Sequence, residues 1–182
     1  MTIRSDQAAA MLADVDSVVA KVKQSRIYGS AALIIMLWGG VNLLRDGLIA
    51  IAPQWLGPRW FLVDAMGVVG TIAILSRKAG LGARLPLRTL AAFLLFYAFG
   101  WIWADLIGDF TPRQETAFWP TLFMFGYAVA GLWFGAAFTA IGLGLTALIL
   151  AAYFWSGAAF PLWMAVITGG GLVLCGLWMR RA

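Results

Sequence analysis

The sequence of 182 residues contains no histidine and only one cysteine, Cys175. Histidine is the commonest general base in enzymes and the commonest metal ligand, so its absence removes both roles. A single cysteine forms neither an intrachain disulfide nor a CxxC site. The sequence also lacks HExxH, a GxSG motif with a distant histidine, aspartates paired at metal spacing, and a Gly-rich phosphate loop. We therefore expect no enzymatic activity, no cofactor and no metal site.

Charged residues are scarce too. They make up 12% of the chain, whereas hydrophobic residues make up 63%, and soluble domains average about 25% charged. This composition supplies too little polar surface to cover a soluble domain, and it is too apolar for a disordered chain. The sequence therefore predicts an integral protein of the lipid bilayer. The net charge of +5 is typical of an oriented membrane protein, so we expect no direct nucleic-acid binding.

Six apolar stretches are candidates for crossing the bilayer, which takes about 20 predominantly apolar residues. Glycine and proline residues mark most of the breaks between them. No charged residue marks the break near Gly135, so five spans with one long bent helix is the alternative. The predicted fold class is an all-α, polytopic transmembrane helical bundle that occupies residues 27–182. The six stretches cover residues 27–51, 60–75, 89–108, 117–135, 137–154 and 159–179.

The positive charges predict the orientation. Arg45, Arg59 and Arg113 are the only basic residues on the side of the bilayer opposite both termini in a six-span topology. All the other lysine and arginine residues fall in the N-terminal segment, the loop after the second span, and the C-terminus. Cytoplasmic loops carry the excess of lysine and arginine. We therefore expect both termini to be cytoplasmic.

Residues 1–26 are predicted to form a separate amphipathic helix in the cytoplasm. Met11, Val15, Val18 and Val22 repeat at spacings of four, three and four, as along one face of a helix. Acidic residues lie toward its start and basic residues toward its end, which suits the helix dipole. Such a helix either packs on the protein's own cytoplasmic face or docks a partner protein or a second copy. A membrane-surface helix is less favoured, because such helices carry larger apolar anchors.

Four polar residues lie within the apolar spans, namely Asn42, Arg45, Asp64 and Asp105. A rise of about 1.5 Å per residue from the cytoplasmic ends places all four in the outer part of the bilayer. Asp46 is expected beyond them, near the outer surface, where it would reach toward water if the polar residues form only a structural ion pair. Polar residues inside a membrane are costly and mark functional sites by default. They predict an outward-facing polar pocket in spans one to three, in which Asp64 pairs with Arg45 or takes up a proton. The alternative is a structural ion pair that fastens these spans together.

Small residues form a ridge along the fourth and fifth spans, and small residues let helix backbones approach closely in lipid. They serve either packing within the monomer or an oligomer seam. The glycines of this ridge that we single out are Gly126, Gly131, Gly135 and Gly144.

A channel or transporter needs a polar path across the whole bilayer, whereas the inner part of these spans offers only scattered threonine and tyrosine residues. The sequence therefore favours a non-catalytic sensor or accessory subunit of a regulatory system. The alternative is a small oligomeric transporter or channel that is proton-linked through Asp64.

Three runs carry a resemblance to a known group: ALIIMLWGGVNLL from Ala32, TPRQETAFWPTLFMFGYAVAGLWFG from Thr111, and the ending GLWMRR. In these runs the chain resembles bacterial predicted six-span membrane proteins that are often encoded beside small winged-helix transcriptional regulators. It is similar, more weakly, to HdeD-type membrane proteins. The resemblance implies six spans in the bacterial cytoplasmic membrane and a regulatory partner, and it supplies no catalytic residues.

Overall fold

The computed structural model describes residues 5–52, 60–79 and 87–181, with side chains described at residue 14 and over 28–52, 61–77 and 91–181. Every element in these ranges is a helix, and no strand occurs among them, so the all-helical prediction is confirmed. The elements are α1 (Ser5–Ile51), α3 (Trp60–Ala79), α4 (Leu87–Trp101), η2 (Ile102–Ile107), α5 (Pro112–Phe134), α6 (Ala136–Trp155), η3 (Gly157–Ala159), α7 (Phe160–Met164), η4 (Ala165–Gly171) and α8 (Leu172–Arg181).

Four helical segments are long and apolar enough to cross a membrane. They correspond to the first, fourth, fifth and sixth expected spans. The apolar helix Ala91–Ile107 is shorter, and α3 is not among the four, so the second and third expected spans remain predictions. The four segments are Tyr28–Ile51, Pro112–Phe134, Ala136–Trp155 and Gly157–Arg181. The last of them, built from η3, α7, η4 and α8, is called the C-terminal helix below.

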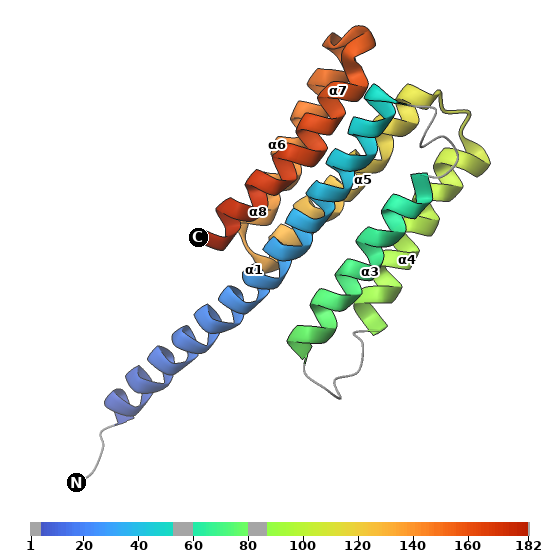
Figure 1. Ribbon diagram of the computed structural model, residues 1–182. Coiled ribbons are helices and arrows are strands. Elements are labelled where there is room, and N and C mark those ends of the chain that lie inside the picture. The colour runs from blue at the N-terminus through green and yellow to red at the C-terminus, as the bar shows by residue number, and fades with distance from the viewer. Residues whose placement is uncertain (1–4, 53–59, 80–86, 182) are drawn as a thin grey trace.

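α1 is one continuous helix of 47 residues, about 70 Å long at 1.5 Å per residue. It has no break at the boundary expected near residue 26, because no proline interrupts that stretch and a single glycine costs a helix only about 1 kcal/mol. The N-terminal part of α1 extends past the end of α8 (Figure 1). Met11, Val15, Val18 and Val22 belong to this part, where the structure describes the backbone but not these side chains.

α1 packs closely against the C-terminal helix along a line of glycines. A Cβ on Gly39 would lie 2.8 Å from the carbonyl oxygen of Gly169, and one on Gly176 would lie 2.8 Å from that of Ala32. A Cβ on Gly169 would lie 2.7 Å from the Cα of Leu43. Such contacts leave no room for a side chain, so the two helices approach at the distance that glycine alone permits.

α5 and α6 form an antiparallel hairpin whose turn is the single residue Gly135 (Figure 1). Gly135 has φ 126° and ψ 153°, a conformation that is essentially restricted to glycine. A Cβ on Gly142 would lie 2.6 Å from the backbone nitrogen of Ala128, and Thr139 Oγ1 donates a hydrogen bond across the hairpin to the Ala128 carbonyl at 3.2 Å. Gly135 therefore ends one helix and begins the next, which argues against one long bent helix.

α4 meets α5 through aromatic rings. The rings of Tyr97 and Trp119 stack with centroids 4.9 Å apart, and those of Phe93 and Phe123 stack at 5.8 Å. Offset and edge-to-face pairs of this kind add about 0.5–1.5 kcal/mol each to the area that they bury. The rings act as spacers, so α4 lies farther from its neighbour than α6 does.

The C-terminal helix changes its winding in the middle. Its segment η4 is π-helical, so each turn there holds more residues than an α turn. The buried side chains explain why this is needed. Phe160, Met164, Thr168, Leu172 and Gly176 recur at every fourth residue and all are buried. In an ideal α-helix Phe160 and Gly176 would lie about 160° apart around the axis. The π-helical segment allows both ends of the helix to face the core.

Candidate polar site between three helices

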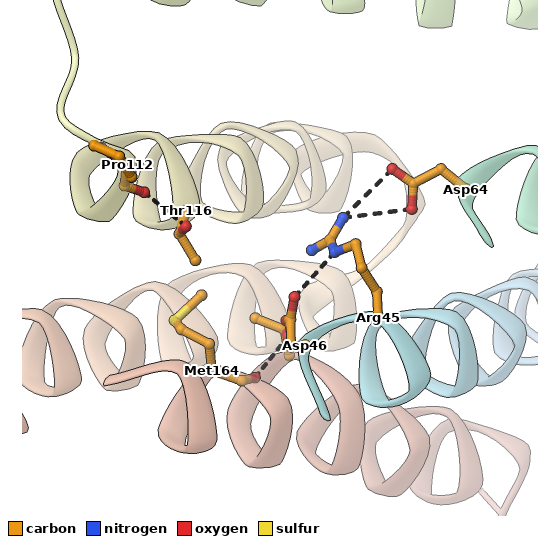
Figure 2. A network of polar contacts seen from close by, with 7 residues as sticks. Arg45, Asp46, Asp64, Pro112, Thr116 and Met164 are labelled. Carbon is orange, nitrogen blue, oxygen red and sulfur yellow. Dashed lines mark hydrogen bonds and ion pairs between the residues drawn. The ribbon is translucent and has the colours of Figure 1, made fainter. Parts of the chain in front are cut away.

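α1 presents two neighbouring charged residues to two different helices. Successive residues of an α-helix are about 100° apart around its axis, so Arg45 and Asp46 cannot face the same neighbour. The Arg45 side chain is directed toward α3 and that of Asp46 toward the C-terminal helix, and the two remain close enough to bond to each other (Figure 2).

The guanidinium of Arg45 lies between two carboxylates (Figure 2). Its Nε donates to Oδ1 of Asp46 at 2.9 Å, and its Nη1 donates to Oδ1 and Oδ2 of Asp64 at 3.4 and 3.5 Å. The first distance is that of a strong charge-assisted hydrogen bond, whereas the other two are at the long end of the range. Asp46 is therefore the principal partner of Arg45, and Asp64 is held more loosely.

Asp46 also bonds to the C-terminal helix. Thr168 Oγ1 lies 3.0 Å from Asp46 Oδ2 and 2.7 Å from the carbonyl oxygen of Met164, one turn earlier. The expectation that Asp46 reaches toward water is wrong, because the side chain is packed under the C-terminal helix and Asp46 is only 3% exposed. The four residues Asp64, Arg45, Asp46 and Thr168, called the polar cluster below, connect α3, α1 and η4 in that order.

The polar cluster holds one positive and two potentially negative groups. The side chains of Arg45 and Asp64 are 19% and 25% exposed, so the cluster opens to its surroundings on the Asp64 side. With both carboxylates ionised its formal charge is −1. Charges attract more strongly where little water screens them, so the short Arg45–Asp46 bond stabilises the buried end. Asp64 is the member that can exchange its partner at the least cost.

The other two residues of the predicted pocket stay outside the polar cluster. Asn42 lies about one turn before Asp46 on α1 and is partly buried, and its side chain makes no hydrogen bond to another described residue. Asp105 lies on η2 and is exposed, and it makes no ion pair with any described residue. The structure thus brings Arg45 and Asp64 together, which is one of the two alternatives given for Asp64, and the cluster contains Asp46 and Thr168 in place of Asn42 and Asp105.

The glycines of the small-residue ridge occupy different environments. Gly131 is buried in the α5–α6 hairpin and Gly135 forms its turn. A Cβ on Gly126 would meet the ring of Phe96 at an ordinary 3.4 Å, whereas one on Gly144 would meet nothing within 4 Å. Gly131 and Gly135 therefore serve packing within the chain, and Gly144 lies on an open face of α6.

Arg113 has a structural role that sequence reasoning missed. Its Nη1 donates to the carbonyl oxygen of Gly157 at 2.7 Å and its Nη2 to that of Tyr153 at 2.6 Å. Its guanidinium also lies over the Phe160 ring, 4.8 Å from the centroid. An arginine in this position satisfies carbonyls that the end of a helix leaves without partners. Arg113 therefore ties the start of α5 to the connection between α6 and the C-terminal helix.

Comparisons of the chain with protein-family models, with curated proteins and with solved structures find no match. Within the described ranges, no three histidine, cysteine, aspartate or glutamate side chains lie together as a metal site would require. The geometry of the polar cluster is therefore the principal guide to function.

Proposed function

We propose that this chain is a non-catalytic membrane protein of the bacterial cytoplasmic membrane, with six spans and both termini cytoplasmic, and that it serves as a sensor or accessory subunit of a regulatory system. The observation that carries the proposal is the polar cluster. It lies inside otherwise apolar helices, and Arg45 and Asp46 of α1 connect α3 to η4. A group that binds to or neutralises one member changes the bonding of the other members, which is what a sensor requires.

The distribution of charge favours sensing over transport. The sequence contains no aspartate, glutamate, lysine or arginine between Glu115 and Arg180. A conduit needs polar or charged groups along the whole path. In this chain the polar cluster is confined to one level of the bundle, so it acts as a site and not as a pathway.

Asp64 is the member of the polar cluster that receives the signal. It is the most exposed member, and its contacts with Arg45 are the longest. A proton or another cation that engages Asp64 weakens its hold on Arg45. Arg45 then bonds more fully to Asp46, and the change reaches the C-terminal helix through Thr168.

The N-terminal part of α1 is the surface proposed for the partner. It belongs to the same continuous helix that carries Arg45 and Asp46, so the sensing residues and the docking residues lie on one helix. The apolar positions Met11, Val15, Val18 and Val22 offer a helical stripe for docking. The resemblance to proteins encoded beside winged-helix regulators favours a cytoplasmic protein of that kind as the partner.

Native mass spectrometry of the protein, extracted gently from its own membrane, tests the proposal. We expect a stoichiometric second protein that is lost when residues 1–24 are deleted. We also expect Asp64→Asn to change how the amount of retained partner depends on the pH of the buffer. Asp105→Asn is the matched control, because Asp105 is an exposed aspartate outside the polar cluster.

A different outcome favours the transporter. A closed homo-oligomer with no second protein, together with proton flux into vesicles that Asp64→Asn abolishes, would replace the sensor by a proton-linked oligomeric conduit. Deletion of residues 1–24 would then leave the flux intact.

A further inference from the structure

The arginines at the two ends of the bundle differ in their bonding. Where α5 begins, Arg113 donates to two carbonyl oxygens, and in the polar cluster Arg45 donates to two carboxylates. At the opposite end, Arg180 and Arg181 are exposed, and neither forms a hydrogen bond or an ion pair with another described residue. Their positive charge is therefore not balanced by the part of the chain that the structure describes.

Close packing of two helices brings these arginines beside α1. α1 and α8 run antiparallel (Figure 1), and a Cβ on Gly176 would lie 2.8 Å from the carbonyl oxygen of Ala32. Counted from that contact at 1.5 Å per residue, Arg180 and Arg181 lie at the level of residues 27–28 of α1. The next two turns of α1 toward its N-terminus add three basic residues. The five residues, called the basic cluster below, are Lys21, Lys23, Arg26, Arg180 and Arg181.

No acidic residue lies close in sequence to the basic cluster. The chain contains no aspartate or glutamate after Glu115, and the nearest one on α1 is Asp16. No acidic residue lies three or four positions from Lys21, Lys23 or Arg26, the spacing at which side chains of one helix pair. The helix packing thus places five positive charges within about 10 Å of one another along the helix axes. A bound anion would relieve their mutual repulsion.

Exposed tryptophans indicate that the basic cluster lies at the membrane surface. Trp178 on α8 is 51% exposed, and Trp133 near the end of α5 is 73% exposed. The rings of Tyr28 on α1 and Phe138 on α6 are 5.7 Å apart, so the α5–α6 turn lies at the same end of the bundle. Indole rings gather at the boundary between the apolar core of a bilayer and its headgroups. A group of four to eight basic residues just beyond a membrane helix is typical of a binding site for anionic lipid.

We propose that the basic cluster binds the phosphate groups of anionic phospholipids at the membrane surface, where α1 leaves the bundle. The lipid supplies the negative charge that the chain lacks there, and arginine is suited to it because a guanidinium binds phosphate through two parallel hydrogen bonds. A general excess of basic residues only orients a membrane protein, whereas this site depends on the contact between α1 and α8. Lipid binding there requires neither a partner protein nor a ligand at the polar cluster, so it goes beyond the proposed function.

Native mass spectrometry of the purified full chain in detergent micelles measures lipid binding directly. The chain is titrated with phosphatidylglycerol, and the dissociation constant of the first bound lipid is compared among variants. Arg180→Gln combined with Arg181→Gln should raise that constant about 25-fold, because each basic residue near a membrane surface contributes about fivefold. Phosphatidylcholine, which has no net charge, should bind to the unaltered chain at least about tenfold more weakly than phosphatidylglycerol.

Arg77→Gln combined with Lys78→Gln is the matched control. This pair also removes two adjacent positive charges from the end of a helix, and Arg77, like Arg180, is exposed. α3 packs on α1 through Gly70 and Leu37. Leu37 lies about 160° around α1 from Gly39, which contacts the C-terminal helix. The control should therefore change the dissociation constant of the first lipid by no more than about twofold.

Three results would overturn the site. Equal weakening by the two pairs of substitutions would mean that the charge of the whole surface attracts lipid, and equal binding of phosphatidylcholine would exclude recognition of charge. Displacement of phosphatidylglycerol by an equal concentration of inorganic phosphate would assign the cluster to a soluble anion. Arg180→Lys combined with Arg181→Lys keeps both charges and should retain the first lipid. If the glutamine pair does not fold, Arg181→Gln alone supplies the measurement, with an expected change of about fivefold.

Discussion

The two carboxylates bound to Arg45 should contribute very differently to stability. Asp46→Asn removes the negative charge of the acceptor in a 2.9 Å hydrogen bond, at a residue that is 3% exposed. It leaves Arg45 with a neutral amide oxygen there and with Asp64, at 3.4 and 3.5 Å, as its carboxylate partner in the polar cluster. We expect it to lower the free energy of unfolding by about 2–3 kcal/mol. Asp64→Asn removes only the longer contacts of a partly exposed pair and should cost at most about 1 kcal/mol.

The measurement is a titration with SDS in mixed micelles, followed by tryptophan fluorescence and circular dichroism. Asp105→Asn provides the baseline for removal of an exposed carboxylate and should cost about 0 kcal/mol. If Asp64→Asn costs as much as Asp46→Asn, Asp64 is the main partner of Arg45 and the assigned order of strengths is wrong. The same titration on the double variant shows whether the two carboxylates act independently.

Three further predictions follow from the packing. Gly169→Ala places a methyl group against the α1 backbone and should lower the free energy of unfolding by about 1–3 kcal/mol. A methyl group at Gly170 meets nothing within 4 Å, so Gly170→Ala should raise the free energy of unfolding by up to about 1 kcal/mol. SDS titration measures both variants, and equal responses would contradict the packing. Arg113→Gln should lower the free energy of unfolding by about 1.5–3 kcal/mol, since the carbonyls of Tyr153 in α6 and Gly157 in η3 lose a charged donor. Thermal unfolding in detergent measures the loss, and an unchanged midpoint would exclude a capping role. Gly135→Ala should lower the free energy of unfolding by about 1–3 kcal/mol, because a φ of 126° strains any residue with a Cβ. Thermal unfolding in detergent measures the change, and a midpoint equal to that of Gly144→Ala would contradict the one-residue turn.

Much of the fold follows from hydropathy alone, because an apolar run of membrane length leaves a helix as the simplest structure with every backbone group satisfied. The expected spans over residues 27–51, 117–135, 137–154 and 159–179 each coincide with a membrane-length helix of the structure to within a few residues. The break at Gly135 was ambiguous because no charge marks it. Its position depends on a backbone conformation, which hydropathy does not report.

The polar site was predicted only in part. Helical rise converts sequence position into height, which places Arg45 and Asp64 in the same outer part of the bilayer but leaves open whether they pair or Asp64 takes up a proton. The burial of Asp46 does not follow, because its partner Thr168 lies 122 positions away and depth does not indicate which way a side chain faces. One signal was present in the sequence: the four-residue spacing from Phe160 to Gly176 departs from α-helical periodicity and indicates wider winding near Thr168.

The single-residue turn at Gly135 has a consequence for how the chain is made. The connection between α5 and α6 is Gly135 alone, so it contains no lysine or arginine that could orient α6 in the membrane. The orientation of α6 therefore follows from that of α5. The two helices are therefore expected to leave the translocon as one preassembled hairpin. The orientation of the C-terminal half during biosynthesis is then decided by the residues that flank this hairpin.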